Sequence, residues 1–334
     1  MRVLVTGGAG FVGRHLTRAL LDRGAAVVCV DPIMALTGGL EPKDWPFFDP
    51  RKSPGFHFER ADCRDFFSHD ASSFDYAFHL AAMVGGRLMI DHEPLAVAED
   101  LAIDAMFWRW AQTTRPGRCV YFSSSASYPI ALQRRVGFQL LAEEIVDFAD
   151  YIGMPDMTYG WAKLTGEYLG RLAHEKFGLK VVSYRPFSGF GEDQDLTYPF
   201  PAIARRVIEH KSGDDFVVWG SGQQMRDFIH IEDCVRCILA TMDKIDDGGA
   251  INISSGRYTS FIELAEVMLE LESKVGTVRG TSDKPEGVFA RGGARALQEK
   301  LGFTPEISLR DGMRRMLDYQ RKSLAAAKGE TALT

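Results

Sequence analysis

Residues 2–13 read RVLVTGGAGFVG, an apolar run that passes directly into glycines spaced GxxGxxG. The run is typical of a buried β-strand, and from Phe11 onward the apolar spacing is that of a helix, which Arg23-Gly24 ends. A second strand-like run covers 25–30 and is closed by Asp31. This order of strand, glycine turn, helix, strand and acidic residue predicts one complete mononucleotide-binding unit.

The three spaced glycines have distinct expected roles. Gly7 allows a tight turn, Gly10 lets the backbone approach a pyrophosphate, and Gly13 lets the helix pack against the strand. The phosphates then meet the free N–H groups and the positive dipole at the start of the helix. Asp31 should accept hydrogen bonds from the adenosine ribose and repel a 2′-phosphate, so the sequence predicts NAD rather than NADP.

The strand and helix patterns keep alternating up to about residue 187. Strand-like runs cover 56–58, 76–80, 119–122 and 180–184, and helical patterns cover 96–112 and 159–177. Such alternation is typical of an α/β protein, and it predicts a doubly wound parallel Rossmann sheet covered by helices on both faces. Ligands of such sheets bind beyond the carboxyl ends of the strands, where the motifs described below also lie.

Beyond residue 187 the alternation loosens, and we expect a smaller C-terminal α/β lobe that binds the substrate. Its expected parts are an acidic loop at 191–201, strand-like runs at 216–219, 250–253 and 275–278, and helices at 261–271 and 309–321. The predicted organisation is therefore a NAD-binding Rossmann domain over 1–186, the substrate lobe over 187–322 and a flexible tail over 323–334.

The composition is that of a soluble globular enzyme. The chain has 334 residues, 46% of them hydrophobic, and a net charge of −6, which argues against general binding to nucleic acid or to a membrane surface. Its start, MRVLVTGG, does not have the pattern of a signal peptide, and no apolar run reaches the ~20 residues that would cross a bilayer. The five cysteines are scattered, so we expect reduced thiols, a cytoplasmic location and no metal site.

Two further motifs carry the expected chemistry. Tyr159 and Lys163 form a YxxxK motif at the start of a predicted helix, so both side chains lie on one helical face. There the lysine ammonium can lower the pKa of the phenol, and the phenolate can remove a proton from a substrate hydroxyl. Upstream, a predicted strand ends in three consecutive serines at 123–125, where a serine can hydrogen-bond the substrate oxygen.

In this order the motifs resemble those of the extended short-chain dehydrogenase/reductases, the NAD-dependent family of nucleotide-sugar epimerases, dehydratases and decarboxylases. The resemblance runs from residue 1 to about 319 and rests on TGGAGFVG at 6–13, Asp62, HLAA at 79–82, SSSA at 123–126, YxxxK at 159–163 and RP at 185–186. It implies that Tyr159 is the catalytic base, that Lys163 also binds the nicotinamide ribose, and that Ser125 is the third catalytic residue. Because family members commonly dimerise through two helices of the Rossmann domain, a homodimer is expected.

The same resemblance assigns the binding residues. Those expected to bind the cofactor are Gly7, Gly10, Phe11, Val12, Gly13, Asp31, Asp62, Cys63, Leu80, Ala81, Ala82, Ser123, Tyr159, Lys163 and Pro186. Those expected to bind the substrate are Gly85, Gly86, Arg87, Ser125, Ser188, Arg226 and Arg291. Arg226 should clamp the nucleotide phosphates, because a guanidinium makes bidentate contacts with phosphate.

Within the family the motifs are closest to GDP-mannose 3,5-epimerase and GDP-fucose synthase. AAMVGGR at 81–87 and KPEGV at 284–288 are similar to segments of these enzymes, so a GDP-sugar is favoured over a UDP-sugar. The acid/base residues of the 3,5-epimerase are missing: Ser127 stands in the place of its cysteine, and Tyr198 is the nearest candidate in the segment that carries its lysine. Dehydratases and decarboxylases carry a glutamate close after the catalytic serine or threonine; the lack of one here disfavours both reactions.

The predicted function is therefore an NAD-dependent epimerase that oxidises a nucleotide-sugar hydroxyl, at carbon 4, to a transient keto-sugar and reduces it on the other face. One alternative is a 4-dehydrogenase that releases a keto-sugar and reduced cofactor. A second is an enzyme similar to GDP-mannose 3,5-epimerase in which Ser127 or Tyr198 replaces the missing groups. A third is a non-catalytic protein that senses NAD. We interpret His79 as structural and the aromatic run at 107–110 as core or subunit interface.

Overall fold

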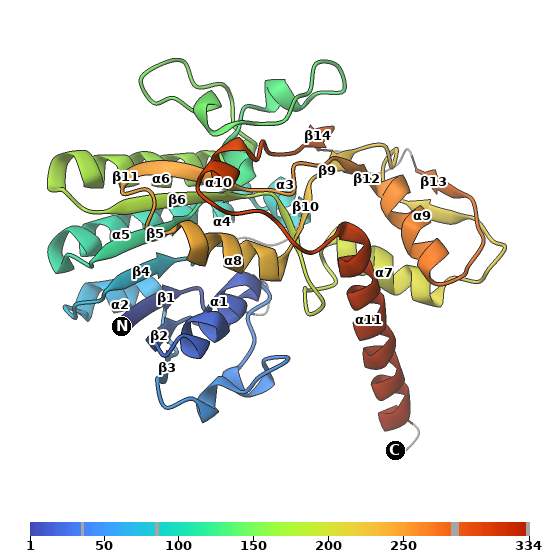
Figure 1. Ribbon diagram of the computed structural model, residues 1–334, viewed down its shortest axis with the longest axis horizontal. Helices are drawn as coiled ribbons and strands as arrows, with labels where there is room; N and C mark the ends of the chain where they lie inside the picture. Colours follow the sequence, from blue (N-terminus) through green and yellow to red (C-terminus); the bar gives the residue numbers. More distant parts are fainter. Residues whose placement is uncertain (35–36, 84–86, 282–286, 332–334) are drawn as a thin grey trace.

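A seven-stranded parallel sheet forms the centre of the larger part of the molecule (Figure 1). The computed structural model describes residues 1–34, 37–83, 87–281 and 287–331. The strands of this sheet are β1 (Arg2–Thr6), β2 (Ala26–Val30), β3 (Phe56–Glu59), β4 (Tyr76–His79), β5 (Arg118–Phe122), β6 (Val181–Pro186) and β11 (Asp247–Ile253). Their order is β11-β6-β5-β4-β1-β2-β3, which confirms the predicted doubly wound sheet. The order reverses between β1 and β4, the place where such sheets bind their ligands.

Helices cover both faces of this sheet because both faces of its strands are apolar. In β1, Val3 and Val5 pack toward α1 (Phe11–Asp22) and α8 (Ile231–Thr241), whereas Leu4 belongs to the core on the other face. That other face is covered by α2 (Cys63–His69), α5 (Glu99–Thr114) and α6 (Met157–Phe177). The aromatic side chains of 107–110 lie in this second core, so the interpretation as core is confirmed. Shorter elements are α3 (Arg87–His92), α4 (Pro94–Val97) and the 3-10 turns Pro42–Asp44, Pro50–Lys52, Ser125–Ser127, Ile130–Gln133 and Glu143–Ile145.

A smaller lobe with its own core is built from the C-terminal half of the chain (Figure 1). Its strands are β7 (Ser188–Phe190), β8 (Phe216–Val218), β9 (Met225–Arg226), β10 (Phe228–His230), β12 (Thr259–Ser260), β13 (Val278–Gly280) and β14 (Ala290–Arg291). Its helices are α7 (Pro199–Glu209), α9 (Phe261–Leu271) and α11 (Leu309–Thr331), whereas α10 (Ala296–Lys300) packs against β11 and the core of the large sheet. The strands form three small sheets, β10-β7, β12-β9-β14 and β13-β8.

The chain crosses between the two parts more than once. After β10 and α8 it returns to the large sheet as β11, which pairs with β6 at the sheet edge. The fully buried Asp227 joins the segments that flank this crossing, because it accepts hydrogen bonds from Ser254, Ser255, Gly256 and Gly293. The domain boundaries at residues 186 and 322 stay a prediction. The structure differs from the predicted division in that β11, which follows residue 186, belongs to the large sheet.

Two helices differ from the sequence prediction. The segment 191–201 was expected to be a loop throughout, yet α7 begins at Pro199. Proline is well suited to the first helical position, and Phe200, Ile203 and Val207 place one face of this helix in the core of the lobe. Helix α11 continues to Thr331 instead of ending at residue 321, so the expected flexible tail is helical over most of its length. Its Ala-rich and Lys-rich composition favours a helix.

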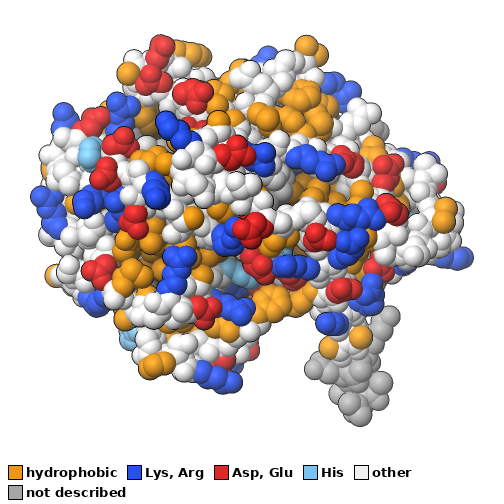
Figure 2. Space-filling view, viewed as in Figure 1, with side chains coloured by type: hydrophobic (Ala, Val, Ile, Leu, Met, Phe, Trp, Pro, Cys, Tyr) orange, Lys and Arg blue, Asp and Glu red, His pale blue; other side chains and the backbone are white. Residues whose placement is uncertain are grey.

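The surface carries charge of both signs. On the face shown in Figure 2, acidic and basic side chains are interspersed, with apolar atoms between them. Among the described residues, none of the helices combines the length and the apolar character that crossing a membrane requires.

Candidate active site

The glycine turn between β1 and α1 forms a cradle with no room for side chains. Gly7 has a φ of +70°, and a Cβ placed on it would lie 2.6 Å from the backbone nitrogen of Ala81. A Cβ on Gly13 would lie 2.3 Å from the carbonyl oxygen of Gly7. Gly10 is the N-cap of α1 and supplies no side-chain cap, so the first N–H groups of this helix can meet an anion. The cradle therefore fits the pyrophosphate of a dinucleotide.

The other predicted cofactor residues lie around this cradle at the ends of neighbouring strands. Asp31 follows β2, is buried, and accepts the N–H groups of Ala9 at 3.1 Å and Ile33 at 2.7 Å. Burial raises the pKa of Asp31, and these two hydrogen bonds oppose the rise. Asp62 caps α2 beyond β3 and pairs with Arg64 at 2.7 Å. The remaining positions are Phe11 and Val12 at the start of α1, Cys63 at the start of α2, 80–82 after β4, Ser123 after β5 and Pro186 at the end of β6.

Tyr159 and Lys163 face the sheet from the first turns of α6. Lys163 is 2% exposed, and its Nζ lies 6.0 Å from the centre of the Tyr159 ring and 5.4 Å from that of Tyr121. Burial raises the pKa of Tyr159, and the Lys163 ammonium opposes this rise, as the YxxxK spacing predicts. Burial alone lowers the pKa of Lys163, but the Asp104 and Asp100 carboxylates outweigh this effect and raise it. Lys163 is therefore held as a cation beside the phenol.

The serine turn after β5 lies directly against the start of α6. Gly160 makes this approach possible, because a Cβ there would lie 2.4 Å from the carbonyl oxygen of Ala126. The Ser124 hydroxyl lies near enough to the Tyr159 phenol to lower the pKa of that phenol. Ser125 begins the adjacent 3-10 turn and is buried. Its catalytic role stays a prediction.

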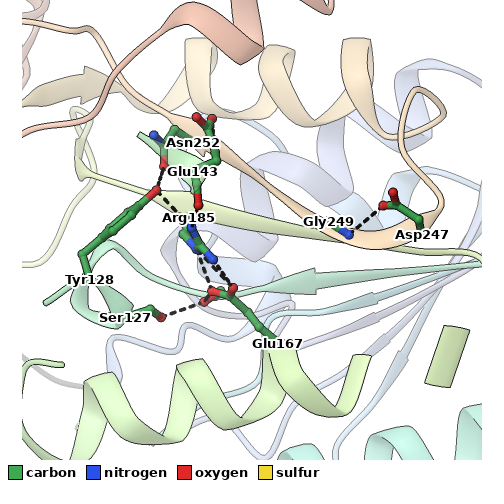
Figure 3. A network of polar contacts seen from close by, with 9 residues as sticks. Ser127, Tyr128, Glu143, Glu167, Arg185, Asp247, Gly249 and Asn252 are labelled. Atoms are coloured by element: carbon green, nitrogen blue, oxygen red, sulfur yellow. Dashed lines mark hydrogen bonds and ion pairs between the residues drawn. The ribbon is translucent and has the colours of Figure 1, made fainter. Parts of the chain in front are cut away.

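A network of buried polar side chains holds the serine turn in place (Figure 3). The Arg185 guanidinium donates to the Glu167 carboxylate at 2.6, 3.0 and 3.1 Å, and both residues are 2% exposed or less. Ser123 donates to Glu167 and lies 3.1 Å from Ser127. Arg185 also donates to the Tyr128 hydroxyl at 3.1 Å. Ser127 is thus fully buried in a structural network, which gives no support to its predicted role as an acid/base group.

Sequence reasoning missed the part that Glu167 plays in this network. Two features of the sequence could have indicated this contact. Glu167 lies one helical turn after Lys163 on α6, and Arg185 lies at the end of a parallel strand. A carboxylate on a buried helix face needs a buried cation, and the sequence offers one at the neighbouring strand end.

The two arginines predicted to bind phosphate lie side by side in the smaller lobe. Arg226 of β9 and Arg291 of β14 are directly paired residues of two parallel strands. Arg291 donates to Gln133 at 2.7 Å and to Asp156 at 2.8 Å. Asp156 is the N-cap of α6, so Arg291 is tied to the helix that carries Tyr159. The Arg226 guanidinium donates to the carbonyl oxygen of Met225 at 2.8 Å. Binding of a diphosphate by these two arginines stays a prediction.

The other predicted residues fall into three groups. Tyr198 is the N-cap of α7, and its pKa is raised to about 12 by burial and, to a smaller extent, by the negative charge of a Tyr159 phenolate. Ser188 begins β7, and Arg87 begins α3. Gly85 and Gly86 lie outside the described residues. His79 is fully buried and lies 2.7 Å from Thr6 Oγ1 and 3.1 Å from Asp104, which supports its interpretation as structural.

Comparisons with known proteins point in the same direction. The NAD-dependent epimerase/dehydratase family model matches residues 3–254. GDP-mannose 3,5-epimerase 1 of Oryza sativa subsp. indica is 28% identical over 319 residues, which are 94% of this chain and 80% of the relative. An uncharacterized UDP-glucose epimerase of Bacillus subtilis (strain 168) is 28% identical over 326 residues, 96% of this chain and 98% of the relative. The structure of UDP-glucuronic acid 4-epimerase from Bacillus cereus, in complex with UDP-glucuronic acid and NAD, has the same fold, with a TM-score of 0.78, 23% identity, and coverage of 97% of this chain and 100% of that chain.

Proposed function

Because this chain belongs to the NAD-dependent epimerase/dehydratase family, we propose that it is a nucleotide-sugar epimerase that works through a transient keto-sugar. NAD is the cofactor of this family, and the side-chain-free glycine cradle and Asp31 fit its pyrophosphate and ribose. The observation that carries the proposal is the Tyr159 phenol, which faces the Lys163 ammonium and the serine turn at the carboxyl ends of the strands.

The reaction follows from this arrangement. When bound, NAD supplies a reversible acceptor of hydride. The Tyr159 phenolate removes the proton of the substrate hydroxyl, at carbon 4 by the proposed assignment, and Lys163 stabilises the phenolate with its charge. Ser125 donates a hydrogen bond to the same oxygen. Inversion requires the keto-sugar to present the other face of its carbonyl to the reduced cofactor before it is reduced again. Tyr159 then returns the proton to the carbonyl oxygen, and no other acid or base is required.

We assign the nucleotide as GDP rather than UDP. The segments at 81–87 and 284–288 are similar to those of GDP-sugar enzymes, and 28% identity to the rice GDP-mannose 3,5-epimerase extends over 94% of this chain. Because UDP-sugar enzymes are also among the similar proteins, the assignment is tested by comparing GDP-sugars with UDP-sugars as substrates.

The paired arginines give a test of substrate binding. Arg226→Ala should raise the KM about tenfold or more, because it removes a charge-assisted contact to the diphosphate, with a smaller change in kcat. Arg257→Ala is the matched control, since Arg257 lies on the surface of the same lobe and pairs with Glu263 at 2.7 Å. Steady-state kinetics with the accepted nucleotide sugar measure both, and equal effects of the two substitutions would contradict the assignment.

We also propose that the protein is a homodimer in which α5 and α6 of each subunit form the interface. Leu101, Trp161 and Tyr168 are large apolar side chains on these helices, and each is more than 40% exposed. Covering them in a dimer removes apolar area from water. The chain has a mass of 37.2 kDa, and light scattering should give twice this mass for the wild-type protein. The Trp161→Glu variant should give the mass of the monomer. A wild-type protein that stays monomeric at high concentration would rule this interface out.

The decisive test of the reaction is to incubate the enzyme and NAD with GDP- and UDP-sugars in heavy water. An isomer without deuterium, identified by mass spectrometry, is the expected result. Two other outcomes would replace the proposal. A product lighter by two hydrogens would indicate the dehydrogenase alternative. Deuterium at carbon 3 or 5 would indicate the 3,5-epimerase alternative.

A further inference from the structure

A buried carboxylate close to Tyr159 and Lys163 has no part in the steps described above. Asp100 is the second residue of α5 and is fully buried. Its Oδ1 accepts the backbone N–H of Met83 at 2.5 Å, whereas its Oδ2 has no hydrogen-bond partner among the described residues. A buried, unpartnered carboxylate oxygen is costly and is unusual in native proteins, so it needs an explanation.

Asp104, one helical turn further along α5, is bound differently. Its Oδ2 accepts the Tyr121 hydroxyl at 2.5 Å, and its Oδ1 lies 3.1 Å from Nε2 of His79. Both oxygens of Asp104 are therefore used in fixed contacts. Asp100 lies on the same side of α5, but its Oδ2 has no hydrogen-bond partner among the described residues.

Lys163 is the cation near both carboxylates. Its Nζ lies 5.4 Å from the centre of the Tyr121 ring, and the hydroxyl of that ring binds Asp104. Burial raises the pKa of Asp100 to about 6, and the Lys163 ammonium opposes this rise. Burial also raises the pKa of Tyr159; Lys163 opposes that rise, and the Asp100 charge adds to it. One ammonium thus stabilises three groups that can be anionic.

Several other ionisable groups surround Asp100, Tyr159 and Lys163. The groups that act on Asp100, Tyr159 and Lys163 are Glu99 and Asp104 on α5, Cys63 on α2, His79 on β4, Tyr121 on β5 and Tyr198 on α7. Burial favours the neutral forms of Cys63, His79 and Tyr121. Glu99 is exposed and lies 3.4 Å from Arg64. The Asp104 charge contributes more than that of Asp100 to the raised pKa of Lys163, but both oxygens of Asp104 are in fixed contacts. Of these two carboxylates, Asp100 is therefore the one with an oxygen left to compete with Tyr159 for Lys163.

We propose that Asp100 is a positioning residue that competes with Tyr159 for the Lys163 ammonium and so sets how readily Tyr159 gives up its phenolic proton. A charged Asp100 leaves less of the lysine charge to stabilise a phenolate, and a neutral Asp100 leaves more. The inference rests on the proposed role of Tyr159 as the base.

The test is Asp100→Asn in the full-length protein with NAD bound. Asparagine has the same shape and can still accept the Met83 N–H, but it carries no charge. The titration of the Tyr159 phenol should move to lower pH by about one unit. It is read as phenolate absorbance in a stopped-flow pH jump, after subtraction of the Tyr159→Phe spectrum in each background. Asp100→Ser, which also keeps an acceptor, gives the same readout if Asp100→Asn does not fold.

Glu99→Gln is the matched control. This substitution removes one negative charge from the residue next to Asp100. Because the Glu99 side chain is 49% exposed, solvent should screen the effect of its charge, and the titration of Tyr159 should not shift. An unchanged titration in Asp100→Asn, or an equal shift in Glu99→Gln, overturns the inference.

The pH dependence of turnover separates this inference from the proposed function. If the titration of Tyr159 shifts and the turnover profile shifts with it, both are supported. If the titration shifts and the turnover profile does not, Tyr159 is not the base, while the coupling to Asp100 stands. If the titration does not shift although Tyr159→Phe is inactive, the coupling is wrong and the proposed function is intact.

Discussion

Tyr159→Phe should lower turnover by about 10²–10⁴-fold, because it removes the group that takes the proton of the substrate hydroxyl. The ring remains, so the packing of α6 against the serine turn should be preserved and NAD should bind as in the wild type. The measurement is the rate of product formation with the accepted nucleotide sugar at saturating concentration, together with the affinity for NAD.

A matched variant removes the same atom from a solvent-exposed position. Tyr151 is 87% exposed, so Tyr151→Phe should leave turnover and NAD affinity unchanged. Retention of most of the turnover by Tyr159→Phe would remove the basis of the proposed mechanism. The motif would then act only in binding the cofactor.

Glu167→Ala should destabilise the protein by about 3–5 kcal/mol, because it leaves the Arg185 guanidinium buried without its carboxylate. Burial alone lowers the pKa of Arg185, whereas Glu167 raises it, so the ion pair keeps this buried arginine charged. The substitution also frees Ser123, and through it the serine turn that faces Tyr159. The measurement is the free energy of unfolding from denaturant titration, with turnover as a second readout.

The same helix carries its own control. Glu175 pairs with Arg171 at 2.7 Å, and both side chains are 40% exposed. Glu175→Ala should therefore leave the free energy of unfolding nearly unchanged, since solvent stabilises both ions when they are separated. If Glu167→Ala and Glu175→Ala lowered the free energy of unfolding equally, the burial of Arg185 would not explain the contribution of Glu167 to stability.

The sequence predicted the features that depend on local pattern. The glycine turn, the parallel strands and the YxxxK helix each occupy a short stretch whose periodicity and residue types are sufficient to identify them. These stretches also locate the catalytic end of the sheet, because the carboxyl ends of parallel strands meet at one edge.

Features that depend on contacts between distant segments were not predictable in this way. The first residues of α7 fall in the segment predicted as a loop, where Pro199 and Pro201 are typical of a helix break. The core of the smaller lobe accepts one face of this helix, which local pattern does not reveal. The orientation of each serine toward Tyr159 depends on the backbone angles of a 3-10 turn, which the run of three serines does not reveal. The sequence pattern does not single out Asp100, which is distinguished by its burial and by the effect of the Lys163 charge on it.

The return of the chain to the large sheet as β11 limits how this protein can be recombined with its relatives. A crossover placed after residue 186 would exchange an edge strand of the Rossmann sheet together with the substrate lobe. The foreign strand would have to match β6 in register and pack against the helices of the parent Rossmann domain. Chimeras that exchange whole lobes should therefore fold poorly. New substrate preferences in this architecture are more readily reached by substitutions in the loops beyond the strand ends, which leave the shared sheet intact.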